Sequence, residues 1–170
     1  MSIWKDMWKW KIKLTQDQWA LVSKKDYDRL SKYRWGAYWN KDIKSFYAVR
    51  KAKLPSGRWT TIQMAREILG LERGDKRQVD HIDHDTLDNR RCNIRIVTPS
   101  QNQHNRKNVK GWKKQGNKYR AAIKANGKYI YLGLFDTPTE AHQAYLDAKK
   151  TYHPTSPIND VQRSTGVFFL

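Results

Sequence analysis

The segment from residue 76 to 108 most constrains the fold, because two short strand patterns flank a polar loop and lead into a helix start. Residues 78–81 and 94–97 are interpreted as two short strands. Thr98, Pro99 and Gln101 then give a cap, a proline at the first helical position and a glutamine three residues after the cap. The sequence therefore predicts the order strand, long loop, strand, helix.

The same segment gathers carboxylates in a basic chain. Asp80, Asp83, Asp85 and Asp88 are four of the 16 acidic residues, and residues 89–135 carry twelve Lys or Arg and no acid. The formal net charge of +18 indicates a polyanionic partner, of which phosphate backbones are the commonest kind. A carboxylate and histidine pocket followed by a cationic stretch predicts a metal site held against a polyanion.

Composition excludes several other classes. A chain of 170 residues has room for one ordinary domain or for two to three small ones. No apolar run approaches the roughly 18 residues of a spanning helix, and the basic, Trp-rich N-terminus lacks the apolar core of a signal peptide. The single cysteine, Cys92, excludes an internal disulfide and a Cys-based zinc cluster. We expect an intracellular, soluble protein without membrane attachment: cytoplasmic and associated with the nucleoid.

Residues 1–75 mix aromatic and charged residues and are expected to support the central segment. Residues 26–33 have helical spacing, whereas residues 45–50 have the pattern of a strand. A Pro-Ser-Gly turn at 55–57 predicts a hairpin, and residues 64–69 predict a short helix that ends at Gly70.

Residues 109–154 predict a further module. Strand patterns at 119–124 and 128–134 are joined by Asn126-Gly127, a strong hairpin signal. A capping-box pattern from Thr137 to Glu140 starts a helix with a small apolar face. Residues 155–170 have no clear periodicity and are expected to form a tail. The predicted fold class is α+β: a mixed segment (1–75), a strand–loop–strand–helix unit (76–108), and a three-stranded antiparallel sheet packed on one helix (109–154).

The central motif resembles that of the HNH endonucleases. Asp80-His81, Asn93 and Asn102, within the phrase VDHIDHDTLDNRRCNIRIVTPSQNQHN, are similar to the phage and intron-encoded members of that family, and the likeness covers most of residues 12–108. It implies a ββα-metal fold, a Mg²⁺ or Mn²⁺ ion and no zinc. It also implies hydrolysis of a DNA phosphodiester bond to 5′-phosphate and 3′-hydroxyl ends.

Roles follow from that resemblance one residue at a time. Asp80 would be the anionic metal ligand and Asn102 a neutral one, because hard divalent ions take oxygen donors and few carboxylates. His81 follows Asp80 on a strand, so its side chain points to the other face, as suits a general base acting opposite the metal. Asn93 would brace the loop. Arginines near the motif could bind flanking phosphates: Arg90, Arg91 and Arg95.

The other acidic and histidine residues of the loop are not assigned a role, because a solvated turn explains them: Asp83, His84, Asp85 and Asp88. One residue departs from the family pattern. Where members often have a His before an Arg, this chain has Ala65 before Arg66, which implies reduced activity if that His supports the site.

Residues 111–147 resemble the APETALA-type DNA-binding domain of plant ethylene-response factors, most specifically in YLGLFDTPTEAHQAY. That family lays a three-stranded sheet in the major groove of DNA. Strand alternation places Arg120, Lys124, Tyr129 and Tyr131 on the outward face. The resemblance adds Lys113, which matches a position where the family uses arginine, and Lys128 is expected as a further DNA contact. Lysine or tyrosine stands where the family uses arginine, which predicts more phosphate contact than base readout.

Together these features predict a site-specific, metal-dependent endonuclease of the HNH homing type that acts on double-stranded DNA as a monomer or weak dimer. A non-catalytic, sequence-specific DNA-binding regulator on the same scaffold is the first alternative. An RNA-binding protein is the second, although the narrow major groove of A-form RNA disfavours a sheet.

Overall fold

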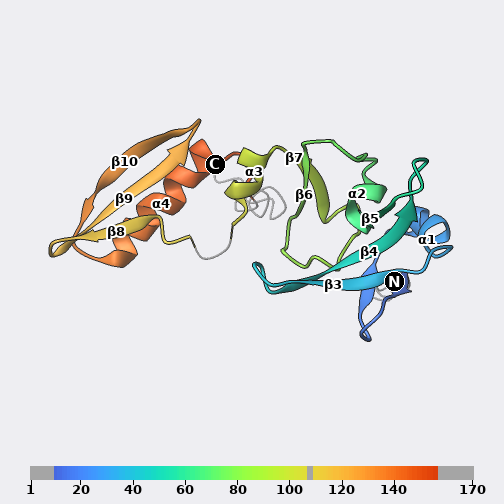
Figure 1. Cartoon of the computed structure of the whole chain (residues 1–170). Helices are drawn as coiled ribbons and strands as arrows, with labels where there is room; N and C mark the ends of the chain where they lie inside the picture. The colour runs from blue at the N-terminus through green and yellow to red at the C-terminus, as the bar shows by residue number, and fades with distance from the viewer. Residues whose placement is uncertain (1–9, 107–108, 157–170) are drawn as a thin grey trace, which may run out of the picture. The chain divides into compact units, whose positions relative to one another are not determined.

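The structure is a computed structural model that describes residues 10–106 and 109–156. Antiparallel sheets and helices alternate along the chain, which is therefore an α+β protein (Figure 1). The chain divides into two compact units, Met1–Pro99 and Ser100–Leu170. No helix in the described part of the chain is long and apolar enough to cross a membrane.

The first unit is built from three antiparallel sheets and two short helices. Its elements in chain order are β1 (Lys11–Lys13), β2 (Trp19–Leu21), α1 (Lys24–Leu30), β3 (Gly36–Asn40), β4 (Ser45–Lys53), β5 (Trp59–Gln63), α2 (Met64–Ile68), β6 (Gln78–His81) and β7 (Ile94–Val97). β1 pairs with β2, β4 lies between β3 and β5, and β6 pairs with β7. The predicted 45–62 hairpin, the helix after it and the strand pair around the polar loop are confirmed. The β1–β2 hairpin was not predicted.

A hydrophobic core joins most elements of the described part of the first unit. It includes Ile12 of β1, Trp35, Met64 of α2 and Ile94 of β7, all of them buried. The Trp35 indole N–H donates to the Leu30 carbonyl at 2.8 Å, so the largest core side chain keeps its polar atom satisfied. Because β7 shares this core with the N-terminal strands, the polar loop between β6 and β7 is anchored to a packed body.

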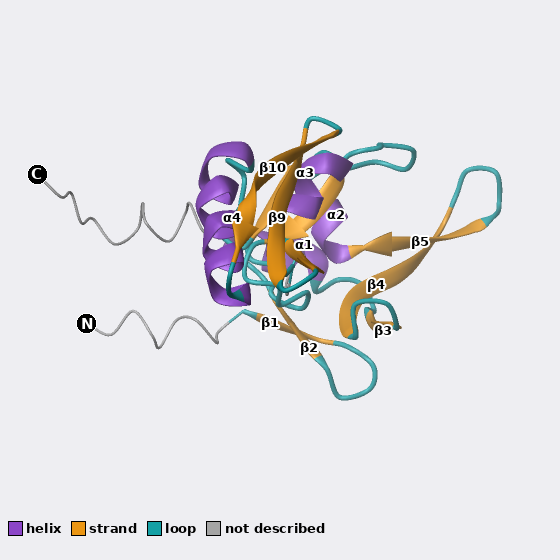
Figure 2. Ribbon diagram, turned by 90° about the vertical axis from the view of Figure 1, so that its left-hand side faces the viewer, coloured by secondary structure: helices purple, strands orange, loops and turns teal. Residues whose placement is uncertain are grey.

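The second unit has a three-stranded sheet and two helices. Its elements are α3 (Pro99–His104), which starts at the boundary, β8 (Trp112–Gln115), β9 (Lys118–Ala125), β10 (Lys128–Phe135) and α4 (Pro138–Tyr152). β9 is the central strand, and α4 packs along the sheet (Figure 2). Thr137 caps α4 by accepting from the Glu140 amide, and the Glu140 carboxylate accepts from the Thr137 amide, so the predicted capping box is confirmed.

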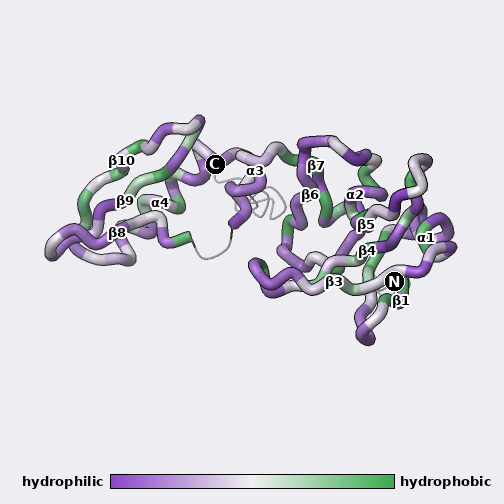
Figure 3. Tube along the Cα trace, in the orientation of Figure 1, coloured by the Kyte–Doolittle hydropathy of each residue, from purple (hydrophilic) through white to green (hydrophobic). Residues whose placement is uncertain are grey.

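The two faces of this sheet differ in the predicted way. Ala121 and Ile123 are buried beneath α4, whereas Lys124 and Tyr129, paired across β9 and β10, are exposed. Figure 3 shows the alternation of hydrophobic and hydrophilic residues along β10. A register shift between Tyr131 and Gly133 interrupts this pairing. Of the predicted tail, only residues 155 and 156 belong to the described part.

Candidate active site

Asp80 and His81 end strand β6 and are both buried. Asp80 pairs with Arg95 across the two-stranded sheet, and its Oδ2 lies 2.9 Å from the Arg95 Nε and 2.8 Å from an Arg95 terminal nitrogen. Successive residues on a strand face opposite sides, so His81 points away from this ion pair, in register with Ile94. The carboxylate and the imidazole are thus held on opposite faces of one strand end.

Asn89 orients the His81 ring. The His81 Nε2 lies 3.4 Å from the Asn89 Oδ1, and the Asn89 Nδ2 donates to the Leu87 carbonyl at 3.1 Å. With its amide group fixed in this way, Asn89 presents an acceptor, which favours the tautomer protonated on Nε2 and makes Nδ1 the proton-accepting nitrogen. Burial lowers the pKa of His81, although the contact with Asn89 and the charge of Asp80 oppose that shift. The lowered pKa favours the neutral imidazole, which is the form that a base requires.

Tyr47 of β4 covers another side of His81. The two rings meet edge to face, with their centroids 6.1 Å apart and an interplanar angle of 62°. Burial and the nearby charge of Asp80 raise the pKa of the Tyr47 hydroxyl. Neither Asn89 nor Tyr47 was singled out in the sequence. Asn89 lies within the motif and could have been found there, but Tyr47 is distant in sequence and only the fold brings it to His81.

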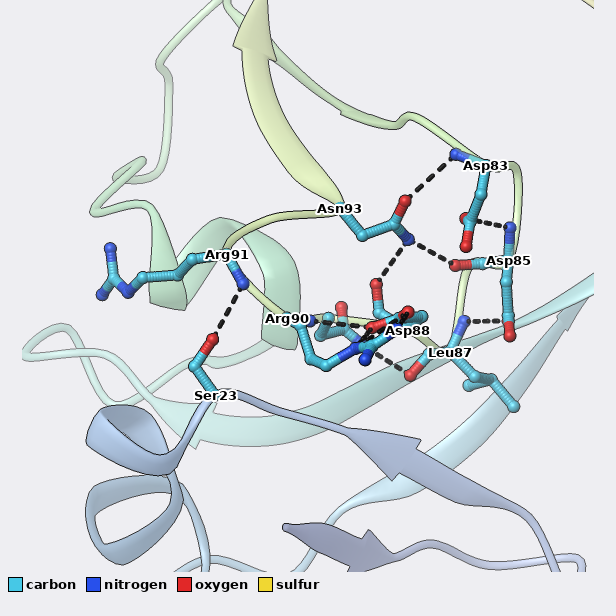
Figure 4. A network of polar contacts seen from close by, with 9 residues as sticks. Ser23, Asp83, Asp85, Leu87, Asp88, Arg90, Arg91 and Asn93 are labelled. Carbon is cyan, nitrogen blue, oxygen red and sulfur yellow. Dashed lines mark hydrogen bonds and ion pairs between the residues drawn. The ribbon is translucent and has the colours of Figure 1, made fainter. Parts of the chain in front are cut away.

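Asn93 joins the two sides of the polar loop (Figure 4). Its Oδ1 accepts from the Asp83 amide at 3.0 Å, and its Nδ2 donates to the Asp88 carbonyl at 2.9 Å. Its own carbonyl accepts from the Ile82 amide at 2.8 Å. These contacts cross the loop directly after His81 and are those expected of a bracing residue.

Two N-terminal strands also hold the loop. Leu21 of β2 donates to the Leu87 carbonyl at 2.9 Å and accepts from the Asn89 amide at 2.8 Å. On the other side, the Ser45 and Thr86 hydroxyls lie 2.7 Å apart, and the Thr86 hydroxyl donates to the Phe46 carbonyl of β4. Backbone contacts thus fix Asn89, and through it the His81 ring.

The arginines of the motif are engaged with carboxylates. Arg90 makes a two-pronged ion pair with Asp88 beside it in the loop. Arg91 reaches Asp26 of α1 at 2.7 and 2.9 Å and also donates to the Ile68 carbonyl at the end of α2. Burial acts to raise the pKa of Asp26, but the hydrogen bonds and charges of Arg91 and Arg29 outweigh it and lower that pKa. Arg90 and Arg91 therefore hold the loop and the helices together.

The donor chemistry at Asp80 suits a hard divalent ion. Asp80 offers carboxylate oxygen, the donor that Mg²⁺ and Mn²⁺ prefer. The Asp83 and Asp85 side chains instead accept from the Asp85 and Leu87 amides within the loop. Within residues 10–106 and 109–156, no cluster of three His, Cys, Asp or Glu side chains could hold a metal ion.

The remaining predicted ligand, Asn102, lies on α3 in the second unit, where it is half-buried. On the same helix, His104 stacks on His153, with ring centroids 3.9 Å apart, and its Nδ1 lies 2.9 Å from the Thr155 hydroxyl. Ala65, which departs from the family pattern, is a buried core residue of α2 in the first unit.

The outer face of the second unit's sheet combines cations with aromatic rings. Arg120 lies over the Tyr131 ring at 5.4 Å and Lys124 over the Tyr129 ring at 5.6 Å. Tyr129 and Tyr131 are 76% and 56% exposed, values that leave their rings open to a partner. Lys113 is exposed and stands opposite Arg120, whereas Lys128, also exposed, pairs with buried Ala125 at the hairpin end.

Comparison with known proteins finds similarity in the segment that carries this centre. Residues 70–104, which hold Asp80, His81, Asn93 and Asn102, match the family model described as HNH endonuclease. A relative described as "Uncharacterized HNH endonuclease L560", from Acanthamoeba polyphaga mimivirus, is 40% identical over 72 residues, or 40% of this chain. The chain spans 37% of that relative's length. No solved structure gives a significant match. The similarity to HNH endonucleases thus covers the segment that carries the candidate site.

Proposed function

We propose that the protein is a metal-dependent endonuclease that hydrolyses phosphodiester bonds of double-stranded DNA. The observation that carries this proposal is the strand end at Asp80 and His81. It holds a carboxylate on one face and, on the other, a neutral imidazole oriented by Asn89. General-base chemistry needs an uncharged, oriented histidine, and a hard metal ion needs an oxygen donor nearby.

In this mechanism the His81 Nδ1 takes a proton from the attacking water, while the His81 Nε2 keeps its own proton in the hydrogen bond to the Asn89 Oδ1. Asn93 keeps the loop closed so that the ring does not turn. Asp80 would hold Mg²⁺ or Mn²⁺, with Asn102 as the second ligand that the resemblance to the HNH motif implies, and the ion would supply charge stabilisation at the phosphate. Attack of this water on phosphorus breaks the bond between phosphorus and the 3′ oxygen, which takes a proton from solvent, so the ends are a 5′-phosphate and a 3′-hydroxyl.

Arg95 would have two roles in this mechanism. Its guanidinium group lies against Asp80, so it balances the buried carboxylate charge. A scissile phosphate bound beside Asp80 would be within its reach. Arg90 and Arg91, engaged with Asp88 and Asp26, contribute to phosphate binding only through the loop that they hold.

The sheet of the second unit would bind the target in the manner of an APETALA-type domain. Arg120 and Lys124 with their stacked tyrosines, and Lys113 beside them, form a cationic, partly aromatic face. Lysines recognise phosphate as point charges and lack the fork that reads guanine, so this face favours positioning over base discrimination. Site-specific cleavage of the homing type by a monomer or weak dimer completes the proposal.

A non-catalytic DNA-binding regulator is the second candidate. The observation that favours it is the Asp80–Arg95 pair, in which an internal cation already satisfies the carboxylate. Ala65, in place of the family's His, points the same way.

Supercoiled plasmid, incubated with protein and Mg²⁺ or with EDTA, separates the two candidates. Metal-dependent nicking that is lost in Asp80→Ala and His81→Ala, but kept in a matched Asn117→Ala variant at an exposed turn, supports the nuclease. Both site variants should still bind duplex DNA within a few fold of the unchanged protein. Intact plasmid with Mg²⁺, Mn²⁺, Co²⁺ and Ni²⁺, together with tight metal-independent binding, would instead establish the regulator.

A further inference from the structure

One face of the β3–β4–β5 sheet in the first unit is open and basic. Cross-strand pairing places Tyr38 beside Tyr47, Lys51 beside Thr61 and Lys53 beside Trp59, and strand alternation puts all six side chains on the same face. The opposite face carries Ala37, Ala48 and Phe46 and packs onto the core. The open face is therefore a second surface, distinct from the sheet of the second unit.

Exposure and charge make this face unusual. Trp59 is 69% exposed, and Tyr38, Lys51, Lys53 and Thr61 are exposed as well. Residues 43–66 carry Lys and Arg at six positions and no Asp or Glu, and two of these cations, Lys51 and Lys53, lie on this face. Large aromatic side chains left in solvent beside cations are typical of a surface that meets a partner. Positive charge without any acid selects a polyanion.

The face also leads to the candidate active site. Tyr47 stands at one end and contacts the His81 ring, whereas Lys53 and Trp59 stand at the other end, next to the 54–58 turn. Figure 2 shows the β4–β5 hairpin reaching out from the rest of this unit and ending in that turn. Six residues of strand at about 3.3 Å each separate Tyr47 from Lys53 by roughly 20 Å, the rise of about six base pairs.

We propose that this face, defined by Tyr38, Tyr47, Lys51, Lys53 and Trp59, binds the phosphate backbone of duplex DNA on one side of the cut. This inference rests on the proposed function, because it takes His81 as the point of cleavage. Lys51 and Lys53 each contact a phosphate, and Trp59 packs against the sugar–phosphate edge at the far end. The unit that carries His81 thus holds its own substrate, in addition to the contacts made by the second unit.

The lysine contacts have a measurable size. Removing one lysine–phosphate ion pair lowers the log–log salt slope of binding to B-DNA by about 0.9. Removing both lowers it by about 1.8, which at 0.1 M salt corresponds to a roughly 60-fold weaker affinity. Lys51 also donates to the Thr61 hydroxyl at 2.9 Å, an exposed hydrogen bond that water can replace.

The test uses the full chain with Lys51→Gln and Lys53→Gln together, and a matched control with Lys25→Gln and Lys32→Gln, which are exposed at α1 and after it. Binding to a labelled 40-base-pair duplex is followed by fluorescence anisotropy from 50 to 300 mM KCl in EDTA. The proposal expects the lower slope in the first variant only. It also expects that Trp59→Ala weakens binding several-fold without changing the slope, since this residue carries no charge.

Equal slopes for the Lys51/Lys53 variant, the control and the unchanged protein would overturn the proposal. So would equal weakening in both lysine variants, because total charge alone would then explain binding. If duplex RNA binds as tightly as DNA with the same slope change, the surface belongs to an RNA-binding protein. Plasmid nicking is measured separately. If the salt slope changes as expected but the protein does not nick plasmid, the proposed DNA-binding surface stands and the proposed nuclease function is wrong.

Discussion

Replacing Asn93 by alanine should loosen the loop between β6 and β7 by a measurable amount. The side chain is buried and makes hydrogen bonds of 3.0 and 2.9 Å to the backbone of Asp83 and Asp88. A typical intramolecular hydrogen bond contributes about 1 kcal/mol, so the two together contribute about 2 kcal/mol to loop closure. Because about 1.4 kcal/mol is a factor of ten, opening should become roughly 30-fold more frequent.

Amide hydrogen exchange at Ile82 reads this opening, since its N–H donates to the backbone carbonyl of Asn93, which the variant keeps. We expect exchange there to accelerate roughly 30-fold in Asn93→Ala, while amides of the β9–β10 ladder in the second unit exchange as before. The same substitution at exposed Asn117 controls for loss of an amide side chain and should leave exchange at Ile82 unchanged. Exchange at Ile82 within threefold of the unchanged protein would show that Asn93 does not brace the loop.

Three further outcomes are expected. Burial lowers the pKa of His81 below its ordinary value of 6.5, so the imidazole stays neutral when the pH falls to 6.5. The rate of nicking should therefore begin to fall only below pH 6.5, and a decline that begins at higher pH would contradict the role of His81 as base. Asp26→Asn removes the negative charge that pairs with Arg91, so the free energy of unfolding of the first unit, measured with urea, should fall by about 2–4 kcal/mol. A fall of less than about 0.5 kcal/mol would show that this ion pair does not stabilise the unit. Gly111→Ala places a Cβ 2.0 Å from a ring carbon of Tyr145 in α4, at a backbone φ of 72°. This variant should lower the free energy of unfolding by more than about 2 kcal/mol. Gly116→Ala, at a φ of 60° with open space, should cost about 1 kcal/mol, and equal costs would exclude a steric cause.

The sequence predicted the elements that depend on residues close together in the chain. The Asn126-Gly127 turn, the Thr137 capping box and the alternation along β9 and β10 each depend on neighbouring residues, and the structure has all three. β1 and β2 were missed because each has three residues, too few for a clear period. Their pairing depends on contacts with each other and with the 82–93 loop, which composition does not reveal.

The candidate site was predictable only in part for the same reason. Asp80 and His81 follow from the motif, and the opposite orientation of their side chains follows from strand geometry. Tyr47 reaches His81 from β4, so its contact depends on long-range packing. The partners of Arg91 could not be predicted from the sequence either. Asp26 lies in α1, and nothing in either local sequence indicates that they meet.

The formal net charge of the chain is +18, and its cationic residues fall into two groups, those paired with carboxylates and those exposed on strands. The motif arginines Arg90, Arg91 and Arg95 meet Asp88, Asp26 and Asp80, so their cationic charge is balanced internally. The lysines of the sheet faces are different. Lys51 and Lys53 in the first unit and Lys113 and Lys124 in the second are exposed on strands.

Counterion release scales with the phosphates that a protein neutralises, and balanced arginines contribute little to it. The salt dependence of DNA binding should therefore come from the strand lysines, whereas the motif arginines should govern loop stability and cleavage. If so, binding and cutting are separable by mutation. Lysine variants of the two sheets would lower affinity at an unchanged rate of nicking on saturated DNA, and Arg90 or Arg91 variants would slow nicking at an unchanged salt slope. A motif arginine that altered the slope by about 0.9 would have to leave its carboxylate for a phosphate on binding, and the loop would then rearrange with the substrate.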